Sequence, residues 1–192
     1  MTDNDAKKRS GKTQLALIAL AFVAPLMLAT WMYTSDRWLP DGGSNYGTIL
    51  QPIVNLAEHL PTSPVVPLTE QQWLMLYVNS GLCDEGCREA LYRLRQSRLM
   101  LANEMGRVTR VFLHGESAPD KVFLEEQHAG LITITDTDLE ILLADKRPVE
   151  QRHGGIFLID PLGNLVMYFS PDLLPGEMVD DIKHLLRLSR IG

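Results

Sequence analysis

The sequence predicts an α/β domain preceded by a single membrane-spanning helix. A long apolar run without charged residues, close to the N-terminus, predicts the helix. From Gln71 onward, strand-like and helix-like runs alternate, which is typical of an α/β sheet protein. The chain has 192 residues and only two cysteines, Cys83 and Cys87, which lie where the first such strand gives way to the first such helix. All of its thiols are therefore concentrated at one strand-to-helix turn.

Residues 14–35 form the predicted membrane anchor. The segment carries no charged residue, and its apolar core is about as long as the ~30 Å hydrocarbon layer of a bilayer. Pro25 does not exclude a spanning helix, because neighbouring groups can satisfy the carbonyl that it frees. Aromatic residues typical of a membrane interface gather at the distal end of the run: Trp31, Tyr33 and Trp38.

The distribution of basic residues predicts the orientation of this anchor. Four basic residues precede the apolar run, and only Arg37 follows it before the cysteine pair. Because basic residues favour the cytoplasmic side, we predict a single-pass protein of the inner (plasma) membrane. Residues 1–13 are then cytoplasmic and the C-terminal domain is periplasmic. The alternative is a cleaved signal peptide, but the long apolar run and the lack of an A-x-A site favour an uncleaved anchor.

The charge of the chain restricts its partners. The net charge is −6, and nucleic-acid binding is disfavoured because phosphate contacts need a basic surface. The predicted compartment is oxidising, so a lone cysteine pair becomes a disulfide unless it is reduced or bound to a metal.

Residues 36–68 are predicted to be a linker between the anchor and the domain. An Asp-Gly-Gly-Ser-Asn run at 41–45 and a proline-rich run at 61–67 are both turn-rich breaks. Residues 46–60 hold scattered apolar side chains, and this stretch can pack along the domain. The domain itself is then expected to span residues 69–192.

The domain is predicted to open with a strand, a helix and a second strand. Residues 73–79 are a continuous apolar run, typical of a strand buried on both faces. Residues 85–105 have leucines at helical spacing with arginines between them, which predicts a long amphipathic helix. Residues 108–113 form the next apolar run and are predicted to be a strand.

The rest of the domain is predicted to alternate and to end with a hairpin and a helix. The predicted elements are a helix at 120–128, a strand at 131–135, a helix at 138–146, strands at 156–160 and 165–169, and a helix at 175–190. A Pro-Leu-Gly-Asn turn joins the last two strands into a β-hairpin. This order is that of a thioredoxin-like domain with an inserted unit. In such a sheet, the turn after the first core strand lies at the edge where ligands usually bind.

The cysteine pair admits three interpretations. At a helix N-terminus, the unpaired N–H groups and the helix dipole favour thiolates, which bind soft metals and attack disulfides. The pair can therefore form a soft-metal site with a ligand from elsewhere in the fold. It can instead be the catalytic pair of a thiol-disulfide oxidoreductase, although such enzymes usually have two intervening residues rather than three. The third interpretation is an inert disulfide closing a short loop.

The five histidines differ in how well their predicted positions suit a third metal ligand. His153 precedes the predicted hairpin beside two glycines, so a flexible turn can bring its imidazole toward the cysteines. His114 ends the second predicted strand at the same sheet edge and is the alternative ligand. His128 ends a predicted helix, where a cationic side chain offsets the dipole without any metal. The remaining two, His59 and His184, are expected to be solvated or packing residues.

The combined pattern resembles the Sco/SenC copper-chaperone family. It consists of an N-terminal anchor, an apolar strand, the Cys-x-x-x-Cys pair, and a late His before an aliphatic strand that ends Ile-Asp-Pro-Leu-Gly-Asn. The resemblance implies a thioredoxin-like fold in which Cys83, Cys87 and His153 bind copper as Cu(I) or Cu(II). It also implies a role in assembling the dinuclear copper centre of cytochrome c oxidase, as metal donor or as thiol reductant. The implied partner is cytochrome c oxidase subunit II or another copper or thiol client.

This chain departs from the family pattern at the predicted site. Asp84 stands where the family usually has proline, and residues 114–118 replace an acidic loop of the family. The spacing from His153 to Pro161 is one residue shorter than in the family, so Arg152 stands at the position of the family's histidine ligand. Either the glycine pair compensates for this one-residue difference with a bulge, or the third ligand is lost. Two alternative functions therefore stay open: a periplasmic thiol-disulfide oxidoreductase, and an assembly scaffold without metal.

Overall fold

The chain consists of two compact units, Met1–Ser44 and Asn45–Gly192. A computed structural model describes residues 3–34, 45–115, 120–148 and 154–189. In the first unit, helix α1 (Asp3–Thr34) contains the stretch Thr13–Trp31, which is long and apolar enough to cross a membrane. A signal sequence passes the same test of length and composition. The predicted N-terminal apolar helix is thereby confirmed.

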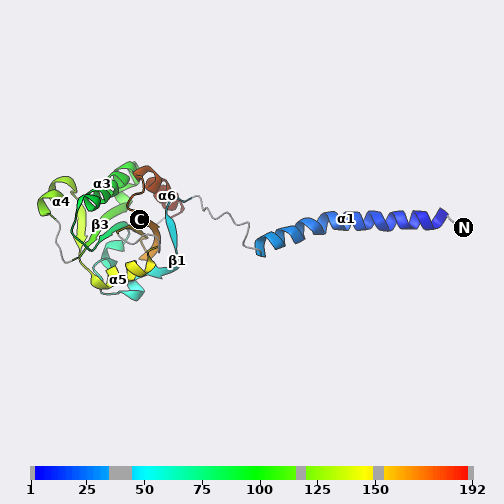
Figure 1. Cartoon of the computed structure of the whole chain (residues 1–192), viewed down its shortest axis with the longest axis horizontal. Coiled ribbons are helices and arrows are strands. Elements are labelled where there is room, and N and C mark those ends of the chain that lie inside the picture. Colours follow the sequence, from blue (N-terminus) through cyan, green and yellow to red (C-terminus); the bar gives the residue numbers. More distant parts are fainter. Residues whose placement is uncertain (1–2, 35–44, 116–119, 149–153, 190–192) are drawn as a thin grey trace. The chain divides into compact units, whose positions relative to one another are not determined.

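The second unit is built on one six-stranded mixed sheet (Figure 1). The strand order is β1-β6-β5-β2-β3-β4, with parallel pairing among β2, β3 and β4 and antiparallel pairing elsewhere. The strands are β1 (Thr48–Asn55), β2 (Trp73–Asn79), β3 (Val108–His114), β4 (Leu131–Ile134), β5 (Ile156–Ile159) and β6 (Asn164–Phe169). This sheet, with its β5–β6 hairpin, confirms the predicted thioredoxin-like α/β fold.

Helices pack on both faces of this sheet. Helices α3 (Glu85–Met100) and α6 (Pro175–Leu188) pack against each other, and α3 also contacts β2 and β3. Helix α4 (Lys121–Gln127) adds Phe123 to the same apolar cluster. Helix α5 (Thr137–Lys146) contributes to the cluster on the other face. The remaining short helices are α2 (Leu56–His59), η1 (Val66–Thr69) and η2 (Ala102–Arg107).

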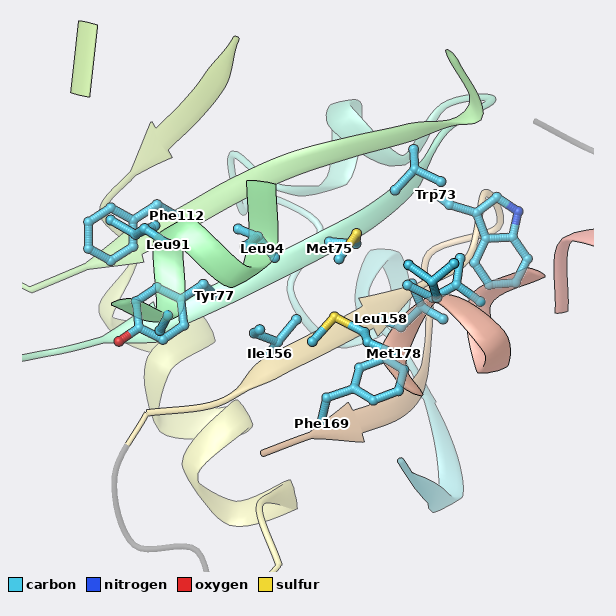
Figure 2. Close-up of a cluster of buried hydrophobic side chains, with 14 of the residues drawn as sticks. Trp73, Met75, Tyr77, Leu91, Leu94, Phe112, Ile156, Leu158, Phe169 and Met178 are labelled. Carbon is cyan, nitrogen blue, oxygen red and sulfur yellow. The ribbon is translucent and has the colours of Figure 1, made fainter. Parts of the chain in front are cut away.

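Strand β2 is the centre of the core because both of its faces are covered. Since side chains alternate along a strand, Met75 and Tyr77 pack on the face that carries α3 and α6 (Figure 2). Leu74 and Leu76 pack on the opposite face, toward α5. All seven positions of β2 except the last, Asn79, are buried, as the continuous apolar run predicts. This buried strand fixes the position at which the cysteine-bearing turn begins.

The predicted linker at 36–68 differs from the structure. Its second half belongs to the domain: β1 pairs with β6 at the edge of the sheet, and Leu56 and Val65 are fully buried in the core. The backbone N–H of Gly47 also donates to a carboxylate oxygen of Asp181 on α6 over 2.8 Å. Pro52 interrupts the strand pattern in sequence, but an edge strand tolerates a residue that cannot donate to a ladder.

Two helix predictions also differ from the structure. Helix α3 ends at Met100 rather than at 105, because Ala102 takes a left-handed φ of 52° and the chain continues as the 3-10 helix η2. Helix α6 ends at Leu188 rather than at 190, and this last residue is 71% exposed. Met178, Ile182 and Leu186 are among the buried positions of α6 that face the core.

Candidate redox and metal-binding site

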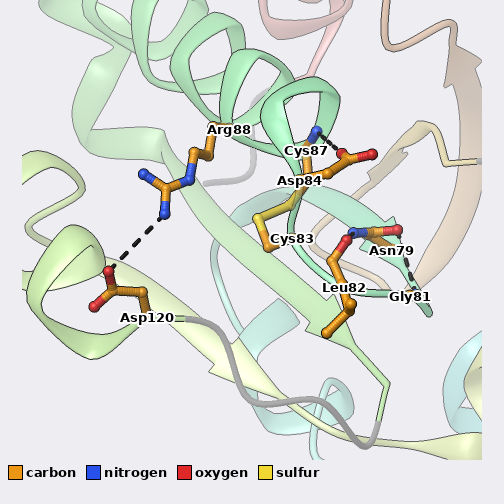
Figure 3. The surroundings of a disulfide bond; sticks show 8 residues. All are labelled: Asn79, Gly81, Leu82, Cys83, Asp84, Cys87, Arg88 and Asp120. Atoms are coloured by element: carbon orange, nitrogen blue, oxygen red, sulfur yellow. Dashed lines mark hydrogen bonds and ion pairs between the residues drawn. A yellow bond between two sulfur atoms is a disulfide. The ribbon is translucent and has the colours of Figure 1, made fainter.

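The turn between β2 and α3 is held by its own side chains (Figure 3). The side-chain amide of Asn79 donates to the carbonyl of Leu82 over 3.3 Å, and its oxygen accepts from the N–H of Gly81 over 3.4 Å. The N–H of Asp84 also donates to the Leu82 carbonyl, over 2.9 Å. These bonds give the segment that leads into Cys83 a defined course.

Asp84 begins the helix that carries the second cysteine. It is the N-cap of α3, and its Oδ1 accepts the N–H of Cys87 over 3.0 Å. Asp84 thus satisfies one of the N–H groups that a helix start leaves unpaired. Cys83 therefore lies just outside the helix, whereas Cys87 lies in its first turn.

The two cysteines form a disulfide, and their environments are unequal. Their Cα atoms are 5.0 Å apart. Cys87 is 3% exposed and belongs to the main apolar cluster, whereas Cys83 is half-buried at the rim of that cluster. Cys83 is consequently the sulfur that a thiol or metal from solvent reaches first.

Aromatic side chains lie in the sheet next to this turn. Burial raises the pKa of Tyr77 to about 12, and the negative charge of Asp84 adds to the effect. The ring of Tyr77 stacks on Phe112 at 5.4 Å between centroids. Tyr77 therefore stays protonated at neutral pH.

Of the two candidate third ligands, His114 lies among the described residues and His153 lies outside them. His114 ends β3 opposite Asn79, and its Nδ1 lies 2.8 Å from the carbonyl oxygen of Gly115. Among the described residues, no three His, Cys, Asp or Glu side chains come together as a metal-binding group. Cys83 and Cys87 are thus the two predicted ligands that the described part of the chain brings together.

An open pocket of about 600 Å³ lies beside the cysteine-bearing turn. It is lined by turn residues 79–82 together with Asp84, Arg147 and Gly154. The carbonyl of Gly155 accepts the N–H of Val78 over 3.0 Å, so the chain entering β5 runs beside the end of β2. The pocket places a cationic and an anionic side chain beside the segment that leads into Cys83.

Asp84→Asn is expected to raise the reduction potential of the cysteine pair by about 30 mV, or about 1.4 kcal/mol for two electrons. Asparagine keeps the capping acceptor but removes a negative charge that opposes a thiolate in the reduced pair. A more stable reduced form means a higher potential. Equilibration with glutathione buffers measures the shift.

Comparison with Asp84→Ala separates the effect of the helix cap from that of the charge. Asp84→Ala removes both, so we expect a similar rise in the reduction potential together with a loss of about 1 kcal/mol in the free energy of unfolding. Identical potentials for the unchanged chain and for Asp84→Asn would contradict an electrostatic role for this carboxylate.

A second group of buried polar residues consists of Arg110 and His128, which belong to none of the motifs recognised in the sequence. Arg110 on β3 is 4% exposed and His128 at the end of α4 is 3% exposed. Burial, followed by the charges of Arg95 and Arg110, lowers the pKa of His128 to about 4. The prediction that His128 offsets the helix dipole as a cation is therefore wrong, because its enclosure keeps the ring neutral at neutral pH. Periodicity gives no signal for such a cluster.

The fold and the cysteine turn define a thioredoxin-like protein. Residues 73–189 match the family described as "Transmembrane-like, thioredoxin-like, C-terminal domain". The chain belongs to this family. None of the curated proteins matches the chain.

Solved structures of Sco proteins are similar to this chain. Apo Sco1 from Thermus thermophilus has 17% identity over 73% of this chain and 96% of that chain, with a TM-score of 0.54. Yeast Sco1 has 19% identity over 65% and 85%, with a TM-score of 0.53. ScoI from Arabidopsis thaliana, solved with copper bound, has 19% identity over 65% and 89%, with a TM-score of 0.51. The predicted resemblance to Sco proteins is thus confirmed for the fold.

Proposed function

We propose that this chain is a membrane-anchored, periplasmic copper-binding protein that assists assembly of the dinuclear copper centre of cytochrome c oxidase. The observation that carries the proposal is the juxtaposition of two sulfurs at one rim of a thioredoxin-like sheet, with Cα atoms 5.0 Å apart. Once reduced, the pair can share one metal ion as cargo. The proposed client is subunit II of the oxidase.

The donor set fits copper better than a hard cation. Two thiolates suit Cu(I), which is soft and tolerates low coordination. We propose His153 as the third ligand, because Cu(II) needs an additional nitrogen donor. Support comes from the Arabidopsis thaliana and yeast proteins of the same fold, which were solved with copper bound.

Metal binding and disulfide formation compete for the same two sulfurs. The pair accepts copper only as the dithiol, because a thiolate is the ligand. An oxidised chain must therefore first receive two electrons from a thiol reductant. This competition makes the redox state of the pair a switch for copper loading.

Copper loading of the full chain in nonionic detergent tests the proposal. The chain is reduced, given Cu(I) without oxygen, desalted and analysed for copper per polypeptide. We expect one copper per chain, and none after Cys83→Ser with Cys87→Ser. His153→Ala should weaken Cu(II) far more than Cu(I), whereas the matched variant His184→Ala should change neither. Failure of the unchanged chain to retain copper would end the proposal.

A second candidate function is thiol-disulfide exchange with a client. The unequal burial of the cysteines favours it, because exchange requires a more accessible attacking sulfur, here the half-buried Cys83, and a buried resolving sulfur, here Cys87. The Cys83 thiolate attacks a client disulfide, a mixed disulfide forms and one client thiolate leaves. The Cys87 thiolate then attacks the Cys83 sulfur and releases the second client thiolate. Two electrons pass to the client, and a periplasmic dithiol must supply two more.

Trapping distinguishes exchange from copper handling. Cys87→Ser should accumulate a mixed disulfide with a disulfide-containing subunit II fragment, and Cys83→Ser should not. Copper retention without any mixed disulfide favours the metal donor. If both the copper and the mixed disulfide are absent, an assembly scaffold remains.

We also propose that α1 is an uncleaved anchor with a cytoplasmic N-terminus. The support is its apolar stretch Thr13–Trp31 together with the basic residues that precede it. The mass of the membrane-extracted chain tests this proposal. A mature chain that lacks the apolar stretch would identify a signal peptide instead.

A further inference from the structure

Arg95, Arg110 and His128 form a basic cluster beneath the turn that joins α4 to β4. Arg95 donates from Nη1 to the carbonyl of Gln127, and Arg110 donates from Nη2 to the carbonyl of Ala129 over 2.7 Å. The two guanidinium groups therefore hold the backbone on either side of His128. Three basic side chains from α3, β3 and the end of α4 thus meet at one place.

The basic cluster has unused donors and no compensating charge. Arg95 Nε, Arg110 Nη1 and His128 Nδ1 are fully buried and have no hydrogen-bond partner among the described residues. In the described part of the chain, no carboxylate forms an ion pair with either arginine. A buried cation without a counter-charge is unfavourable, and so is a buried donor without an acceptor. The arrangement is suited to an anion.

A pocket opens next to the basic cluster. Its volume is about 460 Å³, and His128, Ala129 and Gly130 form one of its walls. A Cβ built on Gly130 would lie 4.0 Å from Nη2 of Arg110, so the wall between the pocket and the guanidinium is thin. Lys121 contributes a cation to the lining and Glu125 an opposing carboxylate.

We propose that this pocket and the basic cluster bind a phosphate-class oxyanion. Arg95 Nε and Arg110 Nη1 are two charged donors without an acceptor, and Nδ1 of the neutral His128 ring is a third donor in the tautomer that carries its proton there. Phosphate oxygens can accept from all of these nitrogens, and the charge of phosphate offsets the two guanidinium groups. The nitrogens are covered by protein atoms, so the proposal requires the turn at 128–130 to shift outward when the anion binds. The site lies on the α4–β4 turn and shares no residue with the cysteine turn, so it does not depend on the proposed copper function.

Binding of inorganic phosphate to the full chain in nonionic detergent tests the site. Calorimetry at constant ionic strength is expected to show saturable binding, and the His128 ring signals in NMR spectra should shift in step. Arg95→Met should weaken binding about tenfold or more, because it removes a charge-assisted hydrogen bond. Arg93→Met is the matched control, since Arg93 lies on the same helix but pairs with Glu89 over 3.0 Å. The control should bind phosphate as the unchanged chain does.

Further measurements identify the source of the phosphate group and check that each variant is folded. Arg110→Met should likewise weaken binding about tenfold or more, and circular dichroism shows whether each variant is folded. Micelles that contain phosphatidic acid replace inorganic phosphate in a parallel titration. Binding of free phosphate points to a soluble ligand, and binding only of the doped micelles points to a lipid headgroup. The proposal is overturned if neither probe binds, or if Arg93→Met and Arg95→Met weaken binding equally.

Discussion

Gly155→Ala is expected to lower the free energy of unfolding by about 3 kcal/mol, through backbone strain and overpacking together. Gly155 has a φ of 129°, which side-chain-bearing residues rarely adopt, and its Cβ would lie 2.2 Å from Cε2 of Tyr168. Tyr168 cannot move aside easily, because it is 2% exposed and its ring meets Phe157 edge-on at 5.2 Å. Urea unfolding of the full chain measures the loss.

Gly154→Ala provides the matched control for this substitution. Gly154 also has a positive φ, 65°, but the nearest atom to its Cβ would be the carbonyl oxygen of Val78 at an ordinary 3.7 Å. Only the left-handed conformation is then unfavourable, by about 1–2 kcal/mol. Equal losses for the two variants would show that the contact with Tyr168 has no energetic weight.

The domain is expected to lose about 3 kcal/mol of stability between pH 6.5 and pH 4 through His128 alone. Burial and the neighbouring Arg95 and Arg110 lower the pKa of its ring from 6.5 to about 4. The unfolded chain therefore binds a proton below pH 6.5 that the folded chain does not bind until about pH 4. Stability from this group is complete above pH 6.5 and falls as the pH falls toward 4.

Unfolding curves at a series of pH values measure this dependence. His128→Gln should flatten the curve between pH 6.5 and pH 4, because it removes the titrating group. His184→Gln serves as control, since His184 is exposed on α6. A curve for His128→Gln as steep as that of the unchanged chain would assign the acid sensitivity to carboxylates instead.

The sequence predicts the centre of this fold well because the central elements carry strong local signals. The β2 run of apolar residues and the Pro-Leu-Gly-Asn turn of the β5–β6 hairpin are recognised from short windows alone. The order of elements then places Cys83 and Cys87 at the end of the central strand, where the structure has them.

The parts that the sequence does not predict depend on distant contacts. Strand β1 contains Pro52 and no clean alternation, and only its pairing with β6 makes it a strand. Arg110 has the period of a core position on β3, but what encloses it is the turn after α4, which lies 19 residues further along the chain. From the sequence alone, a charged residue such as Arg110 is predicted to be exposed to solvent, because its burial depends on contacts made in the tertiary structure.

The edge position of β1 has a practical consequence for where the domain begins. Cutting the chain at residue 69 removes Leu50, Val54, Leu56 and Val65 from the core and leaves β6 as the border of the sheet. An exposed edge strand has a row of unpaired backbone N–H and C=O groups, which can pair with a strand of another molecule. The stretch after Asn45 is therefore expected to protect the domain from self-association, besides connecting it to the N-terminal unit.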